Sequence, residues 1–217
     1  KSLRERTIQK AKDLATEYER FHLLQEILIR QIGCVEEFEE NVLTENVLEL
    51  INELKQLAIT QETKTELWSR NKEIFAIYRS GADSKSTSVR QRADMLIAEV
   101  ERYRMRIGSS FQLASYFFRA YYNYHQIFGE FDRSLEYSEA EYQLYQRHPQ
   151  FKTENPNGYK ICLANCISRA HSARQEDKYL KYIEELKSLP VSSFNEEGEV
   201  FQNVYFSEHL YYINKGA

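Results

Sequence analysis

The sequence has little proline and glycine, with three and seven of them in 217 residues. The tight turns of all-β and alternating α/β proteins depend on these residues, so their scarcity argues against both classes. Glu, Lys, Arg, Leu, Gln and Ala are abundant instead, and all of them favour helix. We therefore predict an all-α protein whose helices cover at least about three-quarters of the chain, far above the roughly one-third of an average soluble domain.

The sequence also lacks any run of the roughly 20 apolar residues that a bilayer-spanning helix needs. Its first residues, Lys1 to Arg6, contain no apolar core of a signal peptide. The formal net charge is −4 and both signs are interspersed, so no net positive field attracts a polyanion. We expect a soluble, cytoplasmic protein without membrane contact, for which nucleic acid is a disfavoured partner.

Disulfide, metal and catalytic motifs are missing as well. Three cysteines, an odd number, argue against a disulfide framework and for a reducing compartment. Cys162 and Cys166 share a helix face, but no second Cys or His pair completes a zinc site, and the five histidines show no His-Glu-x-x-His spacing. Nucleophile-elbow and phosphate-loop motifs are also absent. We predict no metal, no cofactor and no enzymatic activity, with the cysteines as small core residues.

Hydrophobic periodicity near 3.6 residues predicts ten helices. They span about 3–18, 20–32, 36–58, 63–79, 88–107, 110–128, 132–147, 157–174, 177–188 and 194–214. Four capping boxes support helix starts, because the two side chains of such a box satisfy free backbone amides at the first turn. The boxes are Thr63 with Glu66, Ser88 with Gln91, Ser109 with Gln112, and Ser193 with Glu196. The short connections predict antiparallel hairpins.

From Ser109 onward the chain repeats at the scale of helix pairs. The turn at Gly129 is followed about 45 residues later by the turn that begins at Gln175, and Pro149 and Pro190 close the second helices 41 residues apart. In this region the sequence resembles the tetratricopeptide repeat (TPR) family, in a divergent bacterial form. The resemblance rests on Phe118, Tyr121, Tyr122, His125, Gly129, Phe131, Ser134 and Pro149. Its period is longer than the 34 residues of that family.

The resemblance implies an α-α superhelix, or solenoid, of antiparallel helix pairs with a concave binding face. We expect one TPR-like domain over residues 1–217, with a helix pair at 1–34, divergent helices at 35–107 and two and a half clearer repeats at 109–217. The chain stops in a turn after an apolar helix. We therefore expect it to be a fragment of a longer solenoid.

In such a solenoid the first helix of each pair lines the concave face, so its outward positions predict the binding site. On helix 110–128, these positions are Tyr116, Arg119, Asn123 and Gln126, spaced by 3, 4 and 3 residues along one stripe. Arg119 and Asn123 match TPR positions that hold a peptide carboxylate in chaperone-binding domains, and Asn165 lies near a third. The following repeat has Asn203 and Ser207 where that clamp needs cations, so a generic concave site for a peptide or protein is favoured. We expect Arg119 to tolerate replacement, whereas Phe118 belongs to the core.

The function predicted from these features is a scaffold or adaptor that binds a partner protein or peptide on the concave face. One alternative is a regulatory or sensor module within a larger signalling protein. A weaker alternative is a nucleic-acid-binding helical repeat that uses an arginine strip. The strip consists of Arg90, Arg92, Arg102, Arg104 and Arg106, and the interspersed Asp94, Glu99 and Glu101 favour a charge-balanced helix face over a nucleic-acid site.

Overall fold

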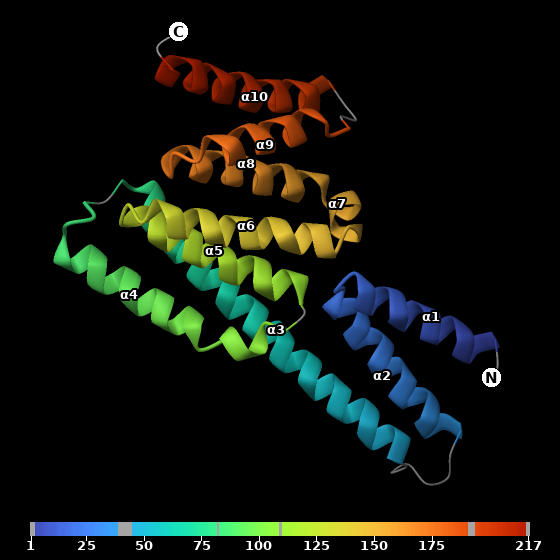
Figure 1. The fold of residues 1–217 in the computed structure, drawn as a ribbon. Helices are drawn as coiled ribbons and strands as arrows, with labels where there is room; N and C mark the ends of the chain where they lie inside the picture. The colour runs from blue at the N-terminus through green and yellow to red at the C-terminus, as the bar shows by residue number, and fades with distance from the viewer. Residues whose placement is uncertain (1–2, 39–44, 82, 109, 191–193, 216–217) are drawn as a thin grey trace.

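The structure of the protein is a computed structural model that describes residues 3–38, 45–81, 83–108, 110–190 and 194–215 (Figure 1). These residues are 86% helical and include no strand, which confirms the predicted all-α class. Within the described ranges, no helix combines the length and the apolarity needed to cross a membrane. Two predicted features, the capping boxes that begin at Ser109 and Ser193, lie outside the described residues.

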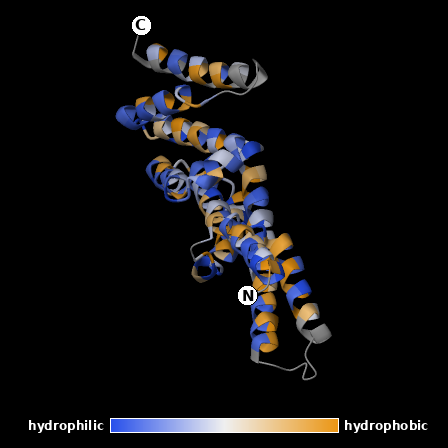
Figure 2. Cartoon of the chain, turned by 90° about the vertical axis from the view of Figure 1, so that its right-hand side faces the viewer, coloured by the Kyte–Doolittle hydropathy of each residue, from blue (hydrophilic) through white to orange (hydrophobic). Residues whose placement is uncertain are grey.

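Ten α-helices and one short 3₁₀ helix, η1, make up the described chain. In order they are α1 (Leu3–Glu17), α2 (Phe21–Phe38), α3 (Glu45–Arg79), α4 (Thr87–Glu101), η1 (Arg104–Arg106), α5 (Phe111–Ile127), α6 (Phe131–Arg147), α7 (Gln150–Glu154), α8 (Pro156–Ser172), α9 (Glu176–Lys187) and α10 (Phe194–Lys215). The long helix α3 runs diagonally beside the α1–α2 hairpin, and α5 to α10 are layered one beyond another (Figure 1). Hydrophobic residues follow stripes along the helices, interleaved with hydrophilic ones (Figure 2).

Two predicted helix starts are wrong. The segments predicted as 36–58 and 63–79 meet in the single helix α3, in which Thr63 is buried and donates a hydrogen bond to the carbonyl oxygen of Ile59 at 2.8 Å. A threonine hydroxyl satisfies a carbonyl four residues back as readily as it caps an amide, so the local pattern was ambiguous. Helix α4 begins after Ser86, and Ser88 lies inside it.

The α5–α6 and α8–α9 segments are two antiparallel helix pairs whose helices and turns occur at matching positions in the sequence. Helices α5 and α8 each have 17 residues and begin 45 residues apart. Helices α6 and α9 also begin 45 residues apart. The turns correspond too, because Gly129 (φ 71°) and Arg174 (φ 56°) both take the left-handed conformation that reverses the chain after a helix. The 45-residue spacing read from the sequence is therefore present in the structure.

Equivalent helices of the two pairs run in the same direction. Three hydrogen bonds from α6 to α9 or its N-cap residue each join residues 43 positions apart: Asp132 with Gln175, Glu139 with Tyr182, and Tyr142 with Glu185, at 3.1, 2.8 and 2.7 Å. The same separation joins Tyr122 of α5 to Asn165 of α8. The constant separation requires α6 and α9 to be parallel. Successive residues of α5, Tyr122, Asn123 and Gln126, bond to the successive residues Asn165, Arg169 and Ser172 of α8, so α5 and α8 are parallel too, as the sequence predicted for 110–128 and 157–174.

Among the described residues, the buried core has three parts. One lies between α1, α2 and α3 around Leu28 and Leu57, the second joins α3, α4 and α5 around Leu67 and Phe117, and the third fills α5 to α10 around Leu163. Successive helices thus bury their apolar faces on one another. No single helix pair encloses its own core.

The turn of the α1–α2 hairpin caps helix α5. The carboxylate of Glu19 accepts hydrogen bonds from the backbone N–H groups of Phe111 and Gln112, at 2.6 and 2.8 Å, while the Gln112 side chain donates to the Glu19 carbonyl. A carboxylate at this position satisfies free amides and complements the positive end of the helix dipole. Arg20 of the same turn pairs with Glu154 of α7, so the hairpin is held against two later elements.

Candidate functional site

Asn123, one of the predicted concave residues, is buried. Its side chain is only 3% exposed and its Oδ1 accepts a hydrogen bond from Arg169 of α8 at 3.2 Å. The prediction that Asn123 faces outward is therefore wrong. Arg169 of α8 reaches across to this position and bonds to the Asn123 side chain.

Arg119 is already engaged inside the protein. Its Nε donates to Oε1 of Glu141 at 2.6 Å, and this carboxylate, which is fully buried, also accepts a bond from Ser115 at 2.7 Å. Burial alone would lower the pKa of Arg119, but the charge of Glu141 outweighs it and holds the pKa above its usual range. Arg119 is only 25% exposed, so the expectation that it is a free binding cation on the surface is wrong.

The other predicted residues also contact neighbouring helices. Gln126 donates to Ser172 at 3.3 Å and Asn165 donates to the hydroxyl of Tyr122 at 3.0 Å, both across the α5–α8 boundary. Tyr116 is half-buried against the core of α3, α4 and α5. The structure therefore brings Asn123, Gln126 and Asn165 together at one helix boundary, where they join α5 to α8. Their predicted role in partner binding stays a prediction.

Arg169 is the centre of this boundary, and sequence reasoning missed it. Its side chain is 4% exposed and lies over the rings of Tyr122 and Tyr78, at 4.9 and 5.6 Å from their centroids. Among the described residues it forms no ion pair, and its guanidinium is held by the two rings, Asn123 and the hydroxyl of Ser168. Since Tyr78 belongs to α3, Arg169 links three helices that are distant in sequence.

Helix α3, which contributes Tyr78 to the contacts of Arg169, also carries a stripe of solvent-exposed side chains on one flank. Leu67 and Ile74 of α3 are buried in the core shared with α5. Arg70 turns to the opposite flank, where it pairs with Glu99 of α4 at 2.6 Å. At about 100° per residue, the flank away from α4 carries Trp68, Lys72, Phe75 and Arg79, and all four are exposed.

The stripe combines apolar rings with positive charge. Trp68 is 47% exposed and Phe75 41%, and the ammonium group of Lys72 lies 6.0 Å from the Trp68 ring centroid. Neither Lys72 nor Arg79 forms an ion pair with another residue in the ranges that the structure describes. The sequence indicated the apolar part of the stripe, because Trp68 and Phe75 each directly follow a residue of the core stripe. Nothing in the local sequence showed which flank of α3 would not be covered by α4.

The arginine strip on α4 and η1 is largely engaged. Arg92 pairs with Glu73, Arg104 pairs with Glu101, and the guanidinium of Arg90 lies 3.8 Å from the ring centroid of Phe128. These contacts neutralise or cover most of the charge that a nucleic acid would need. They favour the charge-balanced interpretation of this helix.

The thiols do not form a reactive or metal-binding group in the described part of the chain. Cys162 and Cys166 are buried, as predicted, while Cys34 is half-buried. Burial raises the pKa of the Cys162 thiol well above its ordinary value. No cluster of three His, Cys, Asp or Glu side chains suited to a metal ion occurs among the residues described.

Comparison of the chain with protein-family models, with curated proteins and with solved structures finds no match.

Proposed function

We propose that this protein is a TPR-like scaffold, a superhelix of antiparallel helix pairs that binds a partner protein. Its support is the 45-residue correspondence of α5–α6 with α8–α9 and the parallel alignment of their equivalent helices. Stacked pairs of this kind present extended surfaces that suit protein or peptide ligands.

The observation that carries the proposal is the open α3 stripe of Trp68, Lys72, Phe75 and Arg79. Exposed aromatic rings beside unpaired cations are typical of binding surfaces, because rings supply large contact area and cations select acidic partners. The partner is accordingly an acidic segment that also offers apolar side chains to Trp68 and Phe75. Tyr116 on α5 is half-buried, and Arg119, Asn123 and Asn165 bond to neighbouring helices inside the proposed scaffold.

Charge reversal tests the surface first. Affinity purification compares the wild type with Lys72→Glu/Arg79→Glu and with a matched control, Lys10→Glu/Arg102→Glu, which changes the net charge equally at exposed positions of α1 and the end of α4. The expected partner is retained by the wild type and the control, and lost by the α3 variant. Equal retention by all three proteins contradicts the assignment.

Trp68 then provides a direct readout, because it is the only tryptophan in the chain. Excitation near the red edge of tryptophan absorption isolates its emission from that of the tyrosines. Titration with the acidic peptide of the purified partner is expected to shift the emission to shorter wavelength, since binding removes the ring from water. A shift caused by single-stranded oligonucleotide instead of the peptide would mean that the α3 stripe binds nucleic acid, which contradicts the assignment of an acidic protein partner.

A further inference from the structure

Helix α3 packs on α2 along one stripe of side chains. This α2-contact stripe has four residues, spaced by 4, 3 and 4 positions: Leu50, Leu54, Leu57 and Gln61. Its leucines pack in one cluster with Leu24 and Leu28 of α2. The Gln61 side chain donates hydrogen bonds to Gln25 at 3.1 Å and to the carbonyl of Phe21 at 3.4 Å. Because α2 begins at Phe21, its contact with α3 ends close to Gln61.

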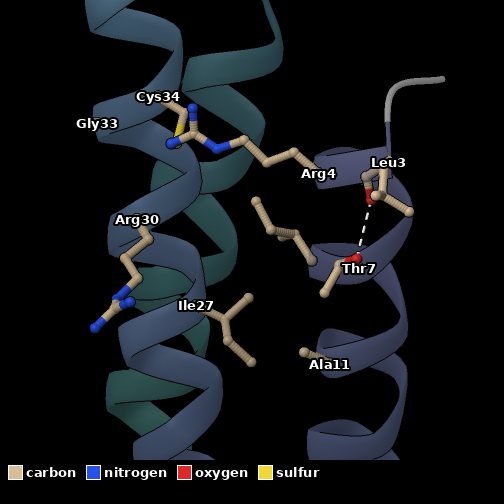
Figure 3. Close-up of a pocket in the computed structure, with 9 residues that line it drawn as sticks. Leu3, Arg4, Thr7, Ala11, Ile27, Arg30, Gly33 and Cys34 are labelled. Atoms are coloured by element: carbon tan, nitrogen blue, oxygen red, sulfur yellow. Dashed lines mark hydrogen bonds between the residues drawn. The ribbon is translucent and has the colours of Figure 1, made fainter.

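Helix α2 turns a neighbouring face to α1. Between these two helices lies a groove of about 990 Å³ that residues of both helices line. In Figure 3, Ile27 of α2 and Ala11 of α1 point toward each other across this groove. Leu24 and Leu28 share a buried cluster with Leu57 of α3. The α2-contact stripe therefore packs on a face of α2 that lies beside the groove.

The exposed α3 stripe continues the α2-contact stripe along the same helix. Each of its residues follows a contact residue by 18 positions: Trp68 follows Leu50, Lys72 follows Leu54, Phe75 follows Leu57 and Arg79 follows Gln61. Eighteen residues make five turns at 3.6 residues per turn, so within the continuous helix α3 both stripes point in the same direction. Figure 1 shows α3 extending beyond the α1–α2 hairpin. The α3 stripe is therefore the part of the α2-facing side that lies past the start of α2.

We propose that an amphipathic α-helix of the partner protein lies on the α3 stripe, in line with α2. The helix depends on the proposed function of the stripe and specifies the form of the partner segment that binds there. Side chains spaced by 4, 3 and 4 positions are the pattern that packs against a second helix, as the α2-contact stripe does against α2. From Trp68 to Arg79 the stripe extends about 17 Å, which matches roughly three turns of a partner helix.

The two cations define the sequence pattern of the bound helix. Lys72 and Arg79 are seven residues apart on α3, and Phe75 lies between them. The partner helix accordingly carries two carboxylates seven residues apart, with apolar side chains at the intervening steps of three and four that face Trp68 and Phe75. An extended segment matches less well, because side chains on one of its faces recur about every 7 Å, whereas Lys72 and Arg79 lie about 10.5 Å apart along the helix.

Three synthetic peptides test the proposal. The stripe peptide is an Ala/Gln helix in which leucines and glutamates alternate along one face at steps of three and four residues. The opposite-face peptide has the same composition, but its glutamates lie on the face away from the leucines. The proline peptide replaces two central alanines of the stripe peptide with proline, which prevents the helix. By fluorescence anisotropy of labelled peptide, the second and third are expected to bind at least about tenfold more weakly than the stripe peptide.

Substitutions place the stripe peptide on α3. Phe75→Gln removes a ring that is 41% exposed and is expected to weaken binding at least about tenfold. The matched control is Ile59→Gln, which changes a side chain that is 42% exposed on another flank of α3 and should leave binding unchanged. Lys72→Glu/Arg79→Glu is expected to reverse the charge preference, so that it binds a version of the stripe peptide with lysines in place of glutamates. Melting curves verify that all three variants are folded.

Three results refute the bound helix. If the proline peptide binds as tightly as the stripe peptide, the stripe holds an extended acidic segment. If folded Phe75→Gln binds the stripe peptide as the wild type does, the peptide lies elsewhere. If sedimentation shows a dimer of the chain that Phe75→Gln dissociates, a second copy covers the stripe.

Failure of the helix and failure of the proposed function are distinguishable. If no peptide binds but Lys72→Glu/Arg79→Glu still loses the partner in affinity purification, the stripe binds its partner in another form and only the helix is wrong. If that variant also retains the partner, the proposed function of the stripe is wrong as well.

Discussion

Replacing Arg119 with alanine is expected to destabilise the protein strongly. The change removes the cation that pairs with Glu141 at 2.6 Å and leaves a fully buried carboxylate whose one remaining hydrogen bond comes from Ser115. Removing one partner of a buried ion pair costs about 3–5 kcal/mol. Since Arg119 is 25% exposed and Ser115 still donates, the expected loss lies near the lower end, about 3 kcal/mol.

The next helix pair shows how the ion pair can be replaced. The positions 45 residues after Arg119 and Glu141 are Ala164 and Leu186, and Leu186 is 1% exposed. The double variant Arg119→Ala/Glu141→Leu copies this pair. It is expected to be about as stable as the wild type or more stable, because apolar replacements of buried ion pairs are often neutral or stabilising by about 1–4 kcal/mol.

The assay is urea denaturation followed by circular dichroism for the wild type, both single variants and the double variant. Glu141→Leu alone should cost less than Arg119→Ala, because the freed guanidinium reaches water more easily than a buried carboxylate does. Strong coupling between the two changes is the expected result. If Arg119→Ala loses less than about 1 kcal/mol, or if the two effects simply add, the pair does not stabilise the fold as the structure indicates.

Further predictions follow from the caps, thiols and tyrosines. Glu19→Ala should lower the free energy of unfolding by about 1–2 kcal/mol in the same assay, because α5 loses its carboxylate cap. In native protein at pH 8, a chromogenic disulfide reagent should modify Cys34 first, whereas Cys162 and Cys166 should react only on unfolding. Burial and the charge of Asp94 raise the pKa of Tyr124 to about 12. Its contribution to stability is complete below pH 10 and disappears as the pH rises to 12, so the free energy of unfolding from urea denaturation should fall over this range as tyrosine ionises in the ultraviolet spectrum.

The helical class and the repeat spacing were predictable from sequence, because both depend on interactions within a few residues. Scarce turn formers and 3.6-residue periodicity predicted the helices, and the turns near Gly129 and Gln175 predicted the 45-residue correspondence of α5–α6 with α8–α9. Helix boundaries were less certain where a side chain had two local partners. Thr63 is such a case, since its hydroxyl bonds to the carbonyl of Ile59 inside α3.

The exposure of individual polar residues was decided by tertiary structure. On an isolated helix, Asn123 and Arg119 lie on one stripe with Tyr116, but the position of α8 buries Asn123 and Glu141 of α6 holds Arg119. The cap of α5 comes from Glu19, 92 residues away in sequence.

Helix formation was predictable because it is governed by hydrogen bonds and periodicity within about four residues. Which flank of each helix stays in water depends on partners brought close only by folding. The exposed flank of α3 and the groove between α1 and α2 are therefore properties of the packing. The apolar and charged residues that give these surfaces their chemistry could be identified in the sequence.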